Sequence, residues 1–148
     1  MPDMPYFPKD RDELRQALEA LGADRLPDHL GLEVLELGDG TSAMRCVVET
    51  KHLASNGYLH AASVVALADT TAGYGCVANL PEGAAGFTTL ELKSNHLSTL
   101  LSGAMVSAGK MAHGGRTTQV WDVTVSAEET GKTLALFRCT QLILYPQS

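Results

Sequence analysis

The feature that most constrains this chain is a stretch of 30 residues in its middle that is almost free of charge. Between residues 52 and 81 the only Asp, Glu, Lys or Arg is Asp69. Residues 61–79 are rich in Ala, Gly, Thr and Val and have no polar face, which is typical of a helix that is buried on all sides. Gly73 and Gly75 each lower the helix propensity by about 1 kcal/mol. Either a neighbour packs closely against these glycines or a cavity uses the space.

Strand patterns flank this helix on both sides. Residues 32–37 and 41–49 alternate between apolar and polar side chains and are joined by the turn sequence Gly-Asp-Gly, which predicts a hairpin. Further alternating segments follow the helix, and their hairpin-length connections predict antiparallel pairing. This order predicts an α+β fold in which a curved antiparallel sheet of five to six strands wraps around a long central helix. The later segments are residues 87–97, 103–113, 116–126 and 132–145.

Length and composition bound the domain organisation. The 148 residues, of which 45% are hydrophobic, suit a single globular domain over residues 1–148 and exclude wholesale disorder. Near its start, residues 9–21 place Leu14 and Leu18 at helical spacing, and Gly22 follows as a stop. We therefore expect one domain with a short helix ahead of the first hairpin.

Charge and cysteine content limit the partners of the chain. With 11 Lys and Arg against 17 Asp and Glu, the formal charge of −6 disfavours sequence-independent nucleic-acid binding. The three cysteines are widely spaced and form no CxxC pair, so reduced thiols are expected rather than a zinc site or a disulfide framework. The first residues lack the apolar run of a secretory signal, and residues 61–80 lack the large aliphatic side chains of a membrane span. We expect a cytoplasmic protein with no metal and no nucleic-acid or membrane partner.

Asp69 is the first candidate for chemistry. A carboxylate alone in an apolar stretch is unfavourable unless it is paired, hydrogen-bonded or protonated, and weak solvation makes it a stronger base. It is therefore a candidate nucleophile or general base. The alternative is that it caps a local turn or faces a solvent gap. Gly73 lies one turn further on the same helix face, where it would leave room beside the carboxylate for substrate or water.

The start of the same helix is the second candidate site. His60 stands just ahead of it, although a lone histidine at such a position is often structural. The first N–H groups of a helix have no partner within the helix and attract negative charge. A carbonyl oxygen against the N–H of Ala61 would therefore be stabilised as an oxyanion. The small side chains of Ala61 and Ala62 allow that approach.

Spacing separates these two candidate groups within one chain. Ala61 and Asp69 are eight residues apart, which is about 12 Å along a helix axis. A carboxylate that attacks a carbonyl must lie about 3 to 3.5 Å from it. Two helices that run antiparallel across a twofold axis would bring each acid to the other chain's helix start. We therefore expect a symmetric dimer with two shared sites.

Four segments of the chain carry motifs in a specific order. Residues 59–62 (LHAA), followed by residues 66–70 (ALADT), are similar to the "HGG…LAD" signature of the PaaI-like hotdog-fold acyl-CoA thioesterases. Residues 88–95 (TTLELKSN) resemble the strand after its helix. Residues 114–117 (GGRT) resemble its "GRR/GRT" strand start, and residues 131–138 (GKTLALFR) resemble its final strand. The order of all the segments is more specific than any one of them.

The resemblance implies a fold, an activity and roles for individual residues. It implies a dimeric or tetrameric hotdog protein that hydrolyses acyl-CoA thioesters with no metal and no cofactor beyond the coenzyme A of the substrate. By position, Asp69 matches the catalytic acid, as nucleophile or as general base on water. Ala61 matches the first glycine, whose N–H polarises the thioester carbonyl, and His60 matches the histidine that helps to position the thioester. The family places the acid and the N–H donor on different subunits.

The chain departs from the family pattern at several positions. Ala61 and Ala62 replace two glycines; an alanine keeps its N–H but requires φ < 0 and tightens the pocket. The family amide residue aligns with Ala54 without a gap, whereas a loop shorter by one residue would put Asn56 there. Gly73 stands where some relatives carry Ser or Thr near the attacking water.

The remaining predictions concern substrate binding. The phosphates of coenzyme A need cations, and Lys93, Lys110 and Arg116 are the candidates, although strand cations are commonly just solvated. The helix face around Asp69 and a partner subunit would form the acyl pocket, which fits an aryl or a medium-chain acyl group equally. A further hypothesis is that the opening helix covers this pocket. The predicted substrate-binding residues are Ala62, Val65, Gly73, Lys93, Asn95 and Arg116.

Two other functions stay open at this point. The alanines at 61 and 62 and the missing amide at 54 favour a non-catalytic module that binds acyl-CoA. The other alternative is a hotdog hydratase or dehydratase. Such enzymes pair an Asp or Asn with a nearby His in a hydratase segment, and the sequence contains no such segment.

Overall fold

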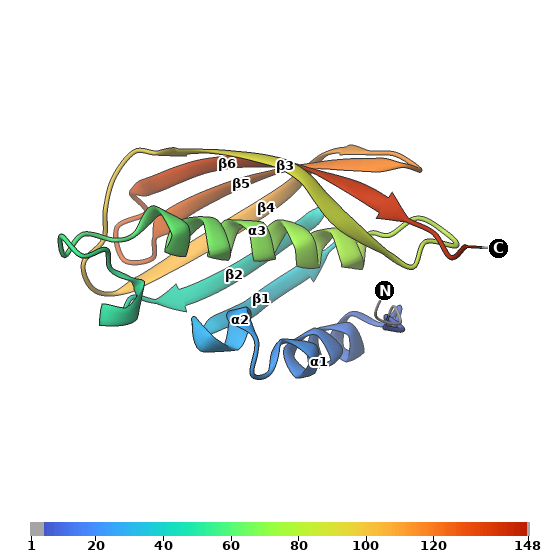
Figure 1. Cartoon of the computed structure of the whole chain (residues 1–148), viewed down its shortest axis with the longest axis horizontal. Coiled ribbons are helices and arrows are strands. Elements are labelled where there is room, and N and C mark those ends of the chain that lie inside the picture. Colours follow the sequence, from blue (N-terminus) through green and yellow to red (C-terminus); the bar gives the residue numbers. More distant parts are fainter. Residues whose placement is uncertain (1–4, 148) are drawn as a thin grey trace.

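A long helix lies across one face of a six-stranded sheet in the computed structural model, which describes residues 5–147 (Figure 1). The helix is α3, and the strands pass behind it. All neighbouring strands are antiparallel, in the order β1-β2-β4-β5-β6-β3. The expected α+β hotdog architecture is confirmed, with six strands. The elements are α1 (Arg11–Gly22), α2 (Leu26–His29), β1 (Leu32–Gly38), β2 (Thr41–Val47), the 3-10 turn Thr50–His52, α3 (Ala61–Ala78), β3 (Gly86–His96), β4 (Ala104–Gly114), β5 (Thr118–Ala127) and β6 (Thr133–Leu144).

The pairing of β3 is the part of the topology that local patterns do not encode. β3 follows α3 directly, yet it pairs with β6, with Gly86 opposite Leu144 and His96 opposite Ala135. β4 then returns to the far side of the sheet and pairs with β2. As a result β1 and β3 form the two edges of the sheet.

Aromatic rings explain the two glycines of α3. A Cβ at Gly75 would lie 2.7 Å from two ring carbons of Trp121, which is fully buried. A Cβ at Gly73 would lie 2.9 Å from the end of the Phe87 ring. Close packing therefore accounts for both positions, because no real Cβ tolerates such distances.

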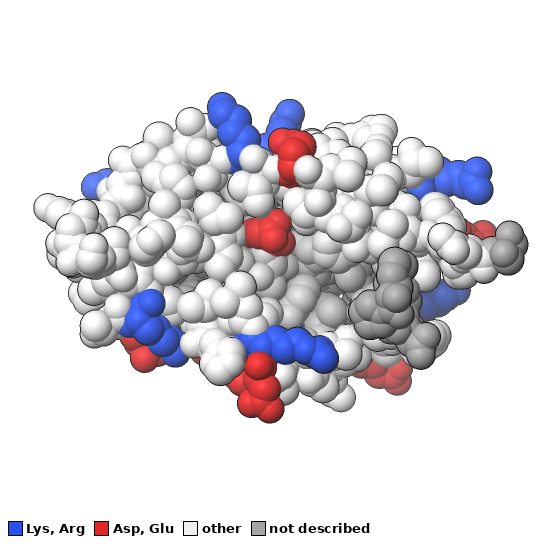
Figure 2. Space-filling view, viewed as in Figure 1, with Lys and Arg blue, Asp and Glu red and all other residues white. Residues whose placement is uncertain are grey.

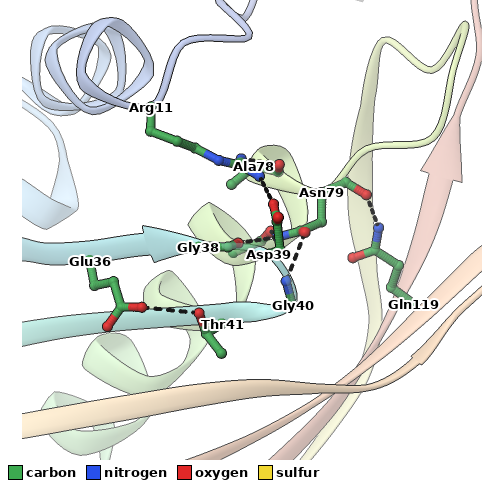
Figure 3. A network of polar contacts seen from close by, with 10 residues as sticks. Arg11, Glu36, Gly38, Asp39, Gly40, Thr41, Ala78, Asn79 and Gln119 are labelled. Carbon is green, nitrogen blue, oxygen red and sulfur yellow. Dashed lines mark hydrogen bonds and ion pairs between the residues drawn. The ribbon is translucent and has the colours of Figure 1, made fainter.

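The C-terminal end of α3 is tied to the first hairpin through Asn79, which follows the helix (Figure 3). Its amide Nδ2 donates to the carbonyls of Gly38 and Gly75, at 3.0 and 2.9 Å, and its Oδ1 accepts from the N–H of Gly40 at 2.8 Å. Its backbone carbonyl accepts from Gln119 Nε2 at 2.8 Å. These bonds satisfy groups that a helix end leaves without partners and hold α3 in place along the sheet.

The opening helix packs where α3 ends. α1 begins at Arg11 with Asp10 as its N-cap, close to the predicted residues 9–21, and buries Leu14 and Leu18. The Arg11 guanidinium donates to the carbonyl of Ala78 and pairs with Asp39 at 2.8 Å (Figure 3). α1 therefore stabilises the C-terminal end of α3.

By length and composition α3 could also cross a membrane. The sheet buries one side of it, from Val64 to Val77, and the core helix of a globular fold has the same composition.

Candidate active site

The candidate site lies on the one side of α3 that the sheet leaves uncovered. Burial along the helix follows its turns: residues 61–62 are exposed, residues 65–66 and 69–70 are half-buried, and the positions between them are buried. Figure 2 shows this face as largely uncharged, with an acidic side chain over the middle of α3. The only acidic residue in α3 is Asp69. We call this side the open face of α3.

The carboxylate of Asp69 lacks a partner. Its Oδ1 is buried and has no hydrogen bond within residues 5–147. Burial raises the pKa of Asp69 above its ordinary value because desolvation disfavours the charged form. Asp69 lies in mid-helix, so it has no turn to cap. An unpartnered buried oxygen of this kind is unfavourable by roughly 1–3 kcal/mol, which marks it as a group available to a ligand.

The start of α3 presents free donors. His60 is the N-cap, and its Nδ1 accepts from the N–H of Ala62 at 2.9 Å. With Nδ1 as an acceptor, Nε2 carries a ring hydrogen, and no hydrogen bond of Nε2 occurs within residues 5–147. The N–H of Ala61 has no hydrogen-bond acceptor in the described part of the chain, and the residue is exposed. The N–H of Ala61 and the Nε2–H of His60 are thus open to a carbonyl oxygen.

Buried His52 fixes this helix start and is a residue that the sequence analysis did not find. Its carbonyl accepts from the N–H of His60 at 3.0 Å and from the hydroxyl of Ser63 at 2.8 Å. Its ring accepts from the N–H of Glu49 at 2.9 Å and bonds the carbonyl of Leu30 through Nε2 at 2.8 Å. The signal available in the sequence was the E-x-x-H spacing of a capping box over residues 49–52.

The separation of the acid from the N–H donor persists in the structure. Ala61 and Asp69 belong to one uninterrupted helix, Ala61–Ala78, so they stay about 12 Å apart along its axis. Val65 lies between them on the open face. One chain therefore carries both halves of a site without bringing them together.

Phe87 and a local turn define the surroundings of two predicted site residues, Gly73 and Asn56. Phe87 occupies the space beside Gly73, so the room expected next to the carboxylate on that side is filled. Asn56 is exposed, and its Oδ1 accepts from the N–H of Tyr58 at 3.1 Å. In the described residues no hydrogen bond joins Asn56 to His60 or Ala61. The asparagine therefore shapes the turn before the helix.

The predicted substrate-binding polar residues are not gathered in one chain. Lys93 and Asn95 are exposed on β3, opposite Arg138 and Leu136 of β6. Arg116 lies in the β4–β5 turn, with its guanidinium 5.5 Å from the centre of the Tyr145 ring. That turn and the start of α3 lie at opposite ends of the sheet (Figure 1).

Metal chemistry has no obvious ligand set here. Within residues 5–147, no group of three or more His, Cys, Asp or Glu side chains is arranged to hold a metal ion.

Comparisons with known proteins show similar sequences and similar folds. The chain matches the thioesterase superfamily over residues 56–134. It is 30% identical over 115 residues to the 1,4-dihydroxy-2-naphthoyl-CoA hydrolase of Listeria monocytogenes serotype 1/2a, which covers 78% of this chain and 92% of that protein. A mutant of the thioesterase PA1618 from Pseudomonas aeruginosa superposes with a TM-score of 0.82 at 27% identity, over 88% of this chain and 93% of that one. The PaaI protein of E. coli, 22% identical over 86% of this chain and 90% of its own, shares the fold with a TM-score of 0.76.

Proposed function

This chain belongs to the thioesterase superfamily and is an acyl-CoA thioester hydrolase, and on that premise we propose that each active site is shared between two copies of the chain. Asp69 of one subunit acts on a thioester whose carbonyl lies against the N–H of the partner subunit's Ala61. The observation that carries this proposal is the buried carboxylate oxygen of Asp69, which has no hydrogen-bond partner within residues 5–147.

The two halves of the site supply complementary chemistry. The free N–H and the positive end of the helix dipole stabilise the negative charge that develops on the carbonyl oxygen. Asp69 either attacks the carbonyl carbon, which expels the thiolate and gives a mixed anhydride that water then hydrolyses, or takes a proton from a water molecule that attacks instead. In both routes the thiolate takes up the proton that the water releases. The products in both cases are the carboxylic acid and the coenzyme A thiol. The Nε2–H of His60 provides a further donor to the thioester.

The free edge of β3 supports a dimer with this geometry. β3 pairs on one side only, and its Leu90 and Leu92 are 56% and 41% exposed. An apolar, unpaired edge is a template for another strand. Two copies of β3 that pair antiparallel about a twofold axis would continue the sheet and set two α3 helices antiparallel. We propose this dimer, alone or as half of a tetramer.

The same dimer would collect the binding residues. A twofold axis perpendicular to the β3 edge and to the sheet reverses one chain relative to the other, so Arg116 of one subunit comes to the end at which the partner subunit's Lys93 lies. We propose that Lys93, Asn95 and Arg116 contact the coenzyme A moiety. For the acyl moiety we propose an aryl or medium-chain group. A relative that is named for hydrolysis of a naphthoyl-CoA supports the aryl choice.

We also propose a cytoplasmic location without a metal or other cofactor. The three cysteines are free and buried. Burial raises the pKa of Cys46 to about 11 and the pKa values of Cys76 and Cys139 to about 12. Thiols with such pKa values stay protonated and unreactive.

The experiment that tests the function is a thiol-release assay with a panel of acyl-CoAs, combined with thermal unfolding in the same solutions. Thiol release above the uncatalysed rate is expected with at least one of them. The non-catalytic alternative, which the alanines at 61 and 62 favour, predicts the opposite. In that case acyl-CoA would raise the melting temperature while the thiol signal stays at background.

The rate of thiol release is also expected to depend on pH through Asp69. The carboxylate must be ionised to attack or to accept a proton, and burial raises its pKa. The acidic limb of kcat/KM against pH should therefore have its midpoint above the ordinary carboxyl pKa. Initial rates across a pH series measure this midpoint. A midpoint at or below the ordinary value would mean that a different group controls the reaction.

A further inference from the structure

The ring of Phe87 closes the open face of α3 one turn beyond the acid. Gly73 follows Asp69 by four residues and so lies on the same side of the helix. The three atoms nearest to a Cβ at Gly73 all belong to the Phe87 ring, the first at 2.9 Å. Phe87 itself is half-buried and packs against the hydrophobic core, which holds the ring against the helix.

Further along, at the C-terminal end of α3, lies a cleft of about 920 Å³. It is formed by residues 5–9, the first turn of α1, the end of α3 and the segment that leads into β3. Two of its lining residues are close in the chain to the contact between Gly73 and the ring: Val77 lies one turn beyond Gly73 on the same side of α3, and Ala85 precedes Phe87 by two residues. The lining is mixed: Leu14, Val77 and Leu80 are apolar, whereas Lys9, Arg11 and Glu82 are charged.

Burial along α3 sets the direction of a bound acyl group. Toward its start the open face is exposed at Ala61 and Ala62, whereas toward its end Gly73 and Val77 are buried. An apolar acyl group gains from the buried direction, and the polar arm of coenzyme A is best accommodated in the exposed one. From Asp69 to Gly73 the axis rises about 6 Å. A carbon chain that advances about 1.25 Å per bond covers this distance in about five bonds.

We propose that Phe87 is the residue that limits the length of the acyl group in the Asp69 site. With the ring in place, the site takes a compact acyl moiety, either one aromatic ring or a chain of about six carbons. Without the ring, a longer chain passes Gly73 and extends along α3 toward Val77 and the apolar part of the cleft. This inference rests on the proposed function, because it assumes that the thioester carbonyl lies at Asp69.

The test compares kcat/KM for decanoyl-CoA and butyryl-CoA in the wild type, Phe87→Ala and Phe87→Leu. Each methylene moved from water into apolar surroundings favours binding about fourfold, so burial of even two further methylenes raises the decanoyl-to-butyryl ratio of kcat/KM tenfold or more in Phe87→Ala; a smaller rise is expected in Phe87→Leu. Phe137→Ala is the matched control. Phe137 is a buried phenylalanine of β6, and none of its atoms is among the three nearest to a Cβ at Gly73. The decanoyl-to-butyryl ratio of kcat/KM in Phe137→Ala should stay within twofold of the wild-type ratio.

The possible results distinguish the role of Phe87 from the proposed function on which it rests. A melting scan shows whether Phe87→Ala is folded. If it is not, the decanoyl-to-butyryl ratio of Phe87→Leu alone tests the role of Phe87. An active wild type with an unchanged ratio in the folded Phe87 variants would overturn the role of Phe87 alone. A wild type that releases no thiol from any acyl-CoA would overturn both the role of Phe87 and the proposed function.

Discussion

Replacing Asp69 with Asn is expected to lower kcat/KM for acyl-CoA hydrolysis by about three orders of magnitude, within the range for loss of a general base. Asparagine has nearly the same shape, but its amide neither attacks a carbonyl nor takes a proton from water at neutral pH. Initial rates of thiol release at matched protein concentration measure the loss. A variant rate within tenfold of the wild type would refute the assignment of Asp69.

The same substitution is expected to stabilise the fold at neutral pH. Because burial raises the pKa of Asp69 in the folded chain, the folded state holds this proton more tightly than the unfolded state does. Stability from this group is then present below the ordinary carboxyl pKa and falls as pH rises toward the raised value. The melting temperature of Asp69→Asn should therefore exceed that of the wild type at pH 7 and approach it in acid.

Asp122 provides the matched control for Asp69. Its carboxylate pairs with Arg138 at 2.5 and 2.7 Å, and this pairing lowers the pKa of Asp122. It lies on β5 and not on α3. Asp122→Asn should leave the rate within twofold of the wild type and should bring no gain in melting temperature at pH 7.

Replacing Ala61 with Pro is expected to lower kcat by about two to three orders of magnitude, as loss of one oxyanion donor does. Proline removes the N–H, yet it is well tolerated as the first residue of a helix. His60 has φ −71° and ψ 132°, which suits a residue before proline. Ala61→Gly is the control, because it keeps the N–H and should retain activity. Full activity in Ala61→Pro would remove this N–H from the mechanism.

Mixing the two inactive variants tests the shared site directly. In a dimer of one Asp69→Asn chain and one Ala61→Pro chain, one site has both defects and the other has neither. Random exchange of subunits makes half of the dimers mixed, so about a quarter of the wild-type activity should return. The measurement is thiol release after the two proteins have been unfolded together and refolded. If no activity returns although mixed dimers form, acid and donor do not come from different subunits.

The two halves of the site were readable from the sequence because each depends on local spacing. The absence of charge around Asp69 and the small residues after His60 predict a buried helix, a lone acid and a free helix start, and all three are features of α3. The E-x-x-H spacing of Glu49 and His52 is local, but the role of His52 escaped because its other partners, Leu30 and Ser63, lie far from it in the chain. Phe87 escaped for the same reason, since a strand pattern does not say which helix residue the ring will meet.

The sequence by itself determined the elements of this protein: one long apolar helix, six alternating strands and a single acid in mid-helix. The hydrophobic period and the turn residues are local signals, because the residues that form each of them lie within a few positions of one another in the sequence. Only the tertiary structure decided that β3 leaves its neighbour β4 to pair with β6, and that the ring of Phe87 fills the space beside Gly73. Those contacts join residues far apart in the chain, and their free energy comes from packing the whole core at once.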